Sequence, residues 1–242
     1  MQKINRVVLV QPNMKWMDWN WKTSWDIHPL NLCLIGAMIR DEYDVHVVDA
    51  NLEEYTPEQF KQVLKDLKPD VVGLTLLTNE YSDVVHLAGK LVKEVSSDIV
   101  TVLGGVYATV SYKAIYKDLN FDYLCVGEGE YTFQQFLSYL NGNGEFPQEG
   151  FLGRKQGELT NPEMVKRTLI QNLDELPFPA WDLVEYNRYT NSVGKVTIDH
   201  PYVFPYTRLM TSRGCPVGCT FCEVEVISGG PFRYRSAQLV VD

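Results

Sequence analysis

The sequence has no hydrophobic run long enough to cross a membrane and no surplus of basic residues. Its longest apolar runs, such as Val7–Val10 or Val71–Leu77, fall far short of the ~20 residues that a membrane helix needs. Lys and Arg number 22 against 31 Asp and Glu, so binding to nucleic acid through phosphate contacts is not expected. The first residues also lack the apolar segment of a signal peptide. These absences predict a cytoplasmic protein with no membrane or nucleic-acid partner.

Cysteine is scarce, and its distribution excludes a disulfide framework. Such a framework scatters paired cysteines over a small secreted domain. Of the five cysteines here, Cys215, Cys219 and Cys222 lie close together, whereas Cys33 and Cys125 stand alone in apolar runs. The cluster is typical of metal ligation in a reducing compartment, and the two isolated cysteines are expected to fill the core.

Over the first 140 residues, short apolar runs alternate with stretches of helical periodicity. The predicted strands are 6–10, 45–49, 71–77, 99–103 and 121–126, and the predicted helices are 30–40, 57–67, 84–95, one that ends near 117, and 131–140. Strands that are apolar throughout indicate a parallel sheet covered by helices on both faces. We therefore predict an α/β fold with a five-stranded parallel sheet of the flavodoxin or Rossmann type. Ligands of such sheets bind beyond the carboxyl ends of the strands.

The strand–helix pattern ends at Asn141–Glu145, a run rich in Asn and Gly. Up to about residue 204 the chain is rich in Pro, Gly, Asn and Tyr without a long period, which is typical of a connecting segment. A further strand, Arg208–Ser212, then leads into the cysteine cluster. We predict a Rossmann-like domain in 1–141, a linker with short hairpins in 142–204, and the beginning of a second domain in 205–242.

The cysteine loop, residues 215–222, reads Cys-Pro-Val-Gly-Cys-Thr-Phe-Cys. Three thiolates in one loop can hold one metal centre, and Gly214 and Gly218 give the backbone freedom to wrap around it. If the centre is a four-iron cube, three protein ligands leave one iron open for chemistry. The alternative is a structural zinc site with a fourth ligand from elsewhere, although zinc sites usually pair two-residue spacers and the spacers here are three and two.

A C-x-x-x-C-x-aromatic-C loop after a short strand resembles the signature of radical S-adenosylmethionine (SAM) enzymes. The resemblance implies that Cys215, Cys219 and Cys222 bind a 4Fe–4S cluster whose open iron takes SAM, and that Phe221 lies near the adenine. Reductive cleavage of SAM then gives a 5′-deoxyadenosyl radical, with a reductant such as flavodoxin or ferredoxin as partner. The resemblance implies that the catalytic domain is a partial TIM barrel. A full barrel needs ~250 residues and only 20 follow Cys222, so we expect this chain to contain only the start of that domain. We expect a fragment that does not turn over alone.

Several segments of the first 180 residues are similar, in order, to the cobalamin-binding domain that precedes the barrel in one radical SAM subclass. They are His28–Leu32, Val48–Asn51, Leu103–Thr109, Val126–Glu130 and Leu173–Pro179. The resemblance implies that cobalamin lies at the strand ends. The expected contacts are Thr75, Leu77, Gly104, Gly105, Gly127, Glu128 and Gly129. The alternative for the glycines is that they only make tight strand-to-helix turns.

His28 is a candidate lower ligand for the cobalt. Cobalamin domains of this kind use D-x-H-x-x-G, and Asp26 and His28 match the pattern, but Asn31 stands where Gly is expected. The segment also lies about 15 residues beyond the first predicted strand instead of directly after it. We therefore interpret His28 as an ordinary residue before a helix, with cobalt ligation as the other hypothesis.

The resemblance implies methyl transfer to an unactivated carbon or phosphorus centre of a small-molecule substrate. Cobalamin would carry the methyl group, and the deoxyadenosyl radical would remove a substrate hydrogen. Two alternatives stay open. One is a radical SAM cyclase or oxidoreductase of the anaerobic magnesium-protoporphyrin ester cyclase type. The other is a non-catalytic corrinoid- or nucleotide-binding module with structural zinc.

Overall fold

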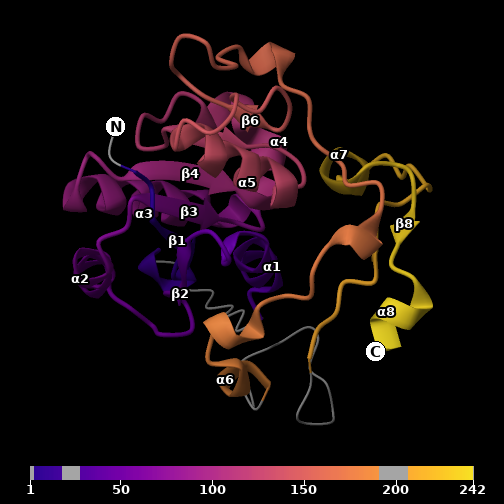
Figure 1. The fold of residues 1–242 in the computed structure, drawn as a ribbon, viewed down its shortest axis with the longest axis horizontal. Coiled ribbons are helices and arrows are strands. Elements are labelled where there is room, and N and C mark those ends of the chain that lie inside the picture. The colour runs from indigo at the N-terminus through magenta and orange to yellow at the C-terminus, as the bar shows by residue number, and fades with distance from the viewer. Residues whose placement is uncertain (1–2, 18–27, 191–206, 242) are drawn as a thin grey trace.

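A six-stranded sheet lies at the centre of the computed structural model, which describes residues 3–17, 28–190 and 207–241 (Figure 1). The strands, in the order in which they pair across the sheet, are β2 (Asp44–Asp49), β1 (Arg6–Gln11), β3 (Val71–Thr75), β4 (Val100–Gly104), β5 (Tyr123–Cys125) and β6 (Phe151–Leu152). The first five pair in parallel, which confirms the predicted α/β fold. Strand β6 lies in the linker, where short hairpins are predicted, but it pairs antiparallel with β5 instead, so it covers an edge that would otherwise be open.

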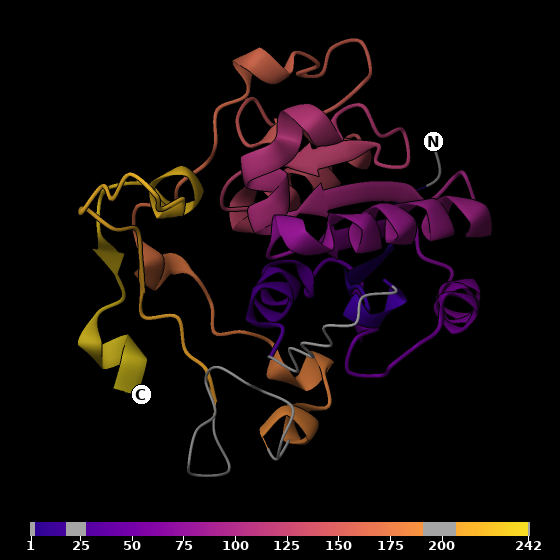
Figure 2. The same ribbon diagram turned by 180° about the vertical axis from the view of Figure 1, so that it is seen from behind.

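Helices cover both faces of the sheet, as Figures 1 and 2 show. They are α1 (Leu30–Ile39), α2 (Pro57–Leu67), α3 (Ser82–Val95), α4 (Gly105–Ile115) and α5 (Glu130–Leu140), with short 3-10 helices at Met14–Trp16, Asn79–Tyr81 and Pro162–Met164. Successive side chains of a strand point to opposite faces. Val8 and Val10 therefore pack with α2, α3 and α4, whereas Val7 and Leu9 pack with α1 and α5. Each face of the sheet has its own apolar core.

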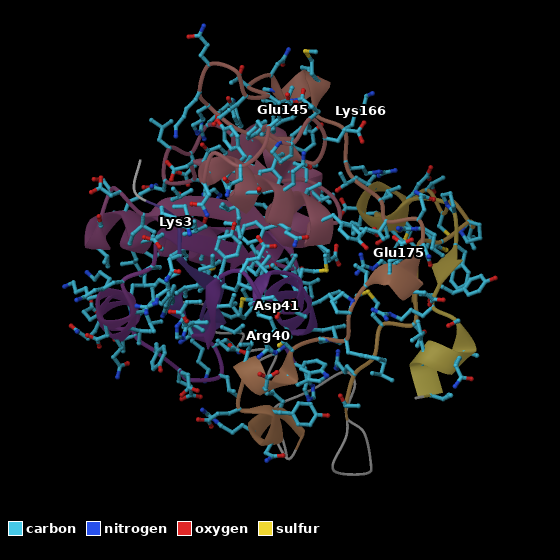
Figure 3. All side chains as sticks on the ribbon, viewed as in Figure 1. Lys3, Arg40, Asp41, Glu145, Lys166 and Glu175 are labelled. Atoms are coloured by element: carbon cyan, nitrogen blue, oxygen red, sulfur yellow. The ribbon has the colours of Figure 1, made fainter. Side chains whose placement is uncertain are left out.

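Residues 170–190, which we call the strap, run along the outside of α1. Their helical turns are the 3-10 helices Leu173–Glu175 and Trp181–Leu183 and the α-helix α6 (Tyr186–Thr190). The backbone N–H of Ala180 donates to the carbonyl of Cys33 at 3.0 Å. Arg40, labelled beside the strap in Figure 3, makes an ion pair with Asp182 at 2.6 Å. These contacts fasten the strap to α1.

The C-terminal segment, residues 207–241, contains a two-stranded antiparallel sheet. Its elements are β7 (Ser212–Arg213), α7 (Val224–Ser228), β8 (Arg233–Tyr234) and α8 (Ala237–Val241). The strand predicted at 208–212 is thus shorter than expected: it has two residues, begins at Ser212 and ends one residue later than predicted. Ser236 caps α8, since its Oγ accepts a hydrogen bond from the N–H of Leu239 at 3.5 Å. In the part of the chain that the structure describes, no helix has the length and apolar character to span a membrane.

Candidate functional site

A cavity of about 640 Å³ lies at the carboxyl ends of the parallel strands. One wall comes from the ends of β1, β3 and β4 and from the turn after β5, where Gln11, Thr75 and Gly104 lie. The opposite wall comes from the C-terminal segment, including Ser212 and Ile227. In open α/β sheets this edge is where ligands bind. The cavity therefore separates the sheet from the segment that carries the three cysteines.

Most of the residues predicted to contact a cofactor line this cavity. They are His28, Thr75, Leu77, Gly104, Gly105, Gly127, Glu128 and Gly129. Phe221 does not line it, and its side chain is 88% exposed. The prediction missed the wall formed by 210–214 and 224–228, because nothing in the local sequence indicates that this segment folds back over the strand ends.

Thr75 and Gly105 show how the cavity floor is built. The Oγ1 of Thr75, a buried residue, accepts a hydrogen bond from the Nδ2 of Asn31 at 3.0 Å, so its own proton is available to another acceptor. Gly105 has a φ of +84°, and a Cβ there would lie 2.5 Å from the Thr75 Oγ1. Only glycine lets α4 begin this close to β3.

The glycines after β5 have packing roles of their own. Gly127 has a φ of +95°, and a Cβ there would lie 2.7 Å from the backbone N and O of Thr168. A Cβ on Gly129 would lie 2.9 Å from the Sγ of Cys125. Gly104 differs, because its Cβ would make only ordinary contact, at 3.5 Å from Cys125. Tight packing thus explains three of the strand-end glycines, and Gly104 is the one that leaves open space at the cavity.

His28 lies among aromatic rings of the strap. Its ring centroid is 5.3 Å from that of Tyr189, 5.4 Å from Tyr186 and 5.6 Å from Trp181. Burial, together with the positive charge of Arg208, lowers the pKa of His28 to about 4, so the imidazole is neutral at pH 7. These contacts give His28 a packing role at the start of α1. Asp26 of the same motif lies outside the described residues.

Glu128 and Glu130 bind two arginines of the C-terminal segment. The carboxylate of Glu128 accepts two hydrogen bonds from the guanidinium of Arg233, at 2.7 and 2.8 Å, and one from the N–H of Ile170 at 2.5 Å. The Oε1 of Glu130 accepts from the Nη2 of Arg213 at 2.5 Å. Burial alone would lower the pKa of Arg213, but the charges of Glu130 and Glu128 outweigh it and raise the pKa. The carboxylate of Glu128 is thus committed to protein partners.

Sequence reasoning missed Arg213 and Arg233. A signal was present, because two glutamates separated by one glycine at a buried strand end require positive partners. The sequence offers many arginines, however, and does not say which of them folds back to this turn.

The cysteine loop is closed at its base by backbone contacts. The N–H of Cys215 donates to the carbonyl of Gly229 at 3.2 Å, and the N–H of Cys222 donates to the carbonyl of Cys219 at 3.0 Å. Gly214 has a φ of +86°, and a Cβ there would lie 2.1 Å from the carbonyl oxygen of Pro231. Cys222 is exposed and the other two thiols are half-buried.

The donor set of this loop fits an iron–sulfur cluster. Thiolates are the protein ligands that hold such clusters, and three accessible cysteines lie on one loop. Within residues 3–17, 28–190 and 207–241, no three Cys, His, Asp or Glu side chains are placed to share a single metal ion. Cys33 and Cys125 are buried in the core, as predicted.

Comparisons with known proteins agree with this fold. Residues 22–137 match the family of B12 binding domains. An uncharacterised methyltransferase of Pyrococcus horikoshii is 31% identical over 218 residues, which are 88% of this chain and 44% of the relative. Cytidylyl-2-hydroxyethylphosphonate methyltransferase of Streptomyces wedmorensis is 30% identical over 260 residues, covering 89% of this chain and 47% of the relative.

A solved structure has the same fold over nearly the whole chain. It is the cobalamin-dependent S-adenosylmethionine radical enzyme OxsB with aqua-cobalamin and S-adenosylmethionine bound. The TM-score is 0.73 at 17% identity, and the match covers 99% of this chain and 31% of that one. The fold and the strand-end cavity thus define a B12-binding type of α/β domain. The match to the B12 binding domain covers residues 22–137, and the chain spans less than half the length of the two methyltransferases described above.

Proposed function

We propose that the cavity holds cobalamin and that the chain is the cobalamin-binding part of a radical SAM methyltransferase. The observation that carries the proposal is the position of the cavity, which has the strand ends on one side and the cysteine-bearing segment on the other. A ligand in the cavity would contact both the strand ends and the cysteine-bearing segment. The two relatives described above are named as methyltransferases, which favours methyl transfer over cyclisation.

The residues of the cavity would bind and orient the cofactor. Leu74, Val102 and Phe133 give the cavity apolar walls that exclude water. The hydroxyl of Thr75 can donate to a polar group of the ligand. When bound, cobalamin supplies a carrier for the methyl group.

The cysteine loop would hold the second cofactor. Cys215, Cys219 and Cys222 would bind a 4Fe–4S cluster, which supplies the electron for SAM cleavage, and Phe221 is exposed on the same loop, where it can stack on an adenine. An external reductant such as flavodoxin or ferredoxin would provide that electron, and the substrate is proposed to be a small molecule. Iron and acid-labile sulfide after anaerobic reconstitution would support the cluster, whereas tight zinc binding without a brown chromophore would contradict it.

Binding of aquocobalamin to the 242-residue chain tests the cavity. Gly104→Leu is the informative variant, because the backbone of Gly104, at φ −128° and ψ −164°, accepts any residue while the side chain would fill the cavity. Gly144→Leu is the matched control, since Gly144 is exposed on the linker and has room for a side chain. In equilibrium dialysis we expect Gly104→Leu to weaken binding about tenfold or more, and Gly144→Leu to leave it unchanged. Equal affinity in both variants would place the cofactor elsewhere.

A further inference from the structure

Two arginines face each other across the β7–β8 pair. Arg213 and Arg233 are directly opposite in the strand register. Their side chains are only 9% and 5% exposed. Like charges opposite each other destabilise a strand pair, and burial of a charge costs more free energy still unless it is paired. This short sheet can therefore form only where both guanidinium groups meet negative partners.

Both partners come from one turn at the end of β5. Glu128 accepts two hydrogen bonds from Arg233, and Glu130 accepts one from Arg213. Arg213 also lies 3.4 Å from the second oxygen of Glu128, which links the two pairs. Two negative and two positive groups are thus buried together with no net charge. Bidentate pairs between arginine and carboxylate fix geometry as well as energy.

The chain between the two arginines, residues 214–232, contains all three loop cysteines. Both ends of segment 214–232, which includes the cysteine loop, are therefore held on the same turn, 127–130. That turn also lines the cavity, as does Arg213. The four-charge cluster therefore connects the cavity wall at 127–130 to the segment that carries the cysteine loop.

We propose that Glu128 and Glu130 are positioning residues, which set the place of the cysteine loop over the cavity by binding Arg233 and Arg213. The significance for catalysis rests on the proposed function, because the loop and the cavity would hold two cofactors that must face each other. The glutamates themselves act through the arginines and do not bind the cofactor.

Electron–electron distance measurements between two nitroxides test the proposal without any cofactor. One label goes on Cys222 in a chain with Cys215→Ser and Cys219→Ser, and the other on the exposed α2 position made available by Lys65→Cys. Cys33 and Cys125 need no replacement, because both thiols are buried and burial raises their pKa to about 12.

In the otherwise unmodified chain we expect one narrow distance distribution. Glu128→Gln combined with Glu130→Gln should widen it about twofold or more, since two buried guanidinium groups lose their negative partners. Arg233→Met, which breaks the cluster from the other side, should widen it too. The control is Lys113→Met, which removes an exposed ion pair with Glu163 and should change nothing. Far-UV circular dichroism of each variant verifies that the sheet is folded. A distribution as narrow in both cluster variants as in the control overturns the proposal.

Aquocobalamin binding to the double glutamate variant separates positioning from cofactor contact. A widened distance distribution supports positioning, also where affinity falls with it, because the C-terminal segment forms the opposite wall of the cavity. A loss of about tenfold with unchanged distances would assign the glutamates to the cofactor and overturn the proposal. Absence of cobalamin binding by the unmodified chain would refute the proposed function and leave the distance result standing, so the two failures can be told apart.

Discussion

The sheet region, residues 3–140, and the C-terminal segment, residues 207–241, are stabilised in different ways. Among the described residues, the sheet region exposes few large apolar side chains: Leu77, Leu119 and Tyr131. The much shorter C-terminal segment exposes Leu209, Met210, Val217, Phe221, Val226, Phe232, Tyr234 and Val241. The sheet region buries its own core on two faces, whereas the C-terminal segment has little core of its own.

Polar contacts hold the C-terminal segment in place. Besides the cluster of Arg213 and Arg233, the guanidinium of Arg235 donates to the carbonyls of Leu176 and Pro177, at 3.1 Å each. A segment held in this way depends on a few directional contacts, and those between charged groups fix its geometry as well as its energy. The comparison teaches that stability lies in the sheet region, and that the position of the cysteine loop depends on charges.

The largest effect on the free energy of unfolding is expected from a substitution in the core of the sheet region. The ring of Phe136 is fully buried and lies 4.6 Å from that of Phe151 and 4.5 Å from that of Tyr123. Phe136→Ala should lower the free energy of unfolding by about 3–5 kcal/mol, because it removes buried surface and leaves a cavity. Phe232→Ala, at a ring that is 56% exposed, should cost at most about 0.5 kcal/mol. Urea unfolding measures both, and equal costs would break the comparison.

An intermediate effect on the free energy of unfolding is expected at His28, where the strap meets the sheet region. The pKa of His28 is about 4 in the folded chain against an ordinary value of 6.5, so the unfolded chain takes up the proton first as pH falls. The stability gained from the neutral ring is complete above pH 6.5 and is lost between pH 6.5 and 4, by about 1–3 kcal/mol. Urea unfolding across this range should show the loss in the unmodified chain and a smaller one in His28→Phe. If the free energy of unfolding falls equally with pH in both chains, His28 is not the cause of the loss.

A smaller effect is expected at the start of α2. Thr56 and Gln59 form a capping box, in which each side chain bonds to the other's backbone N–H, at 3.2 and 2.8 Å. Thr56→Ala should cost about 1 kcal/mol in the same unfolding assay. It should leave the two-nitroxide distance distribution unchanged, because α2 and the C-terminal segment lie on opposite sides of the molecule (Figures 1 and 2). A widened distribution would contradict the separation of the two regions.

Much of the sheet region could be predicted from sequence because its signals are local. Apolar strands, helical periodicity and the pair Thr56–Pro57 set elements whose observed ends lie within a few residues of the predicted ones. The pairing of β6 with β5 could not be predicted, because a strand of two residues carries no signal for a distant partner and the open edge of β5 determines where it pairs.

The cavity was predicted from one side only. Gly104 and Thr75 follow apolar strands, so parallel topology alone brings them to one edge. The opposite wall depends on Arg213 and Arg233 finding Glu128 and Glu130, which are more than 80 residues away in sequence. Pairings of this kind depend on tertiary packing, and no local pattern specifies them.

Hydrogen–deuterium exchange with and without aquocobalamin tests the central claim most directly. If the ligand lies between the strand ends and the cysteine-bearing segment, both 104–109 and 127–130 on one wall and 224–228 on the other should exchange more slowly when it is bound, while α2 stays unchanged. Protection confined to one wall, or found on α2 instead, would contradict the account.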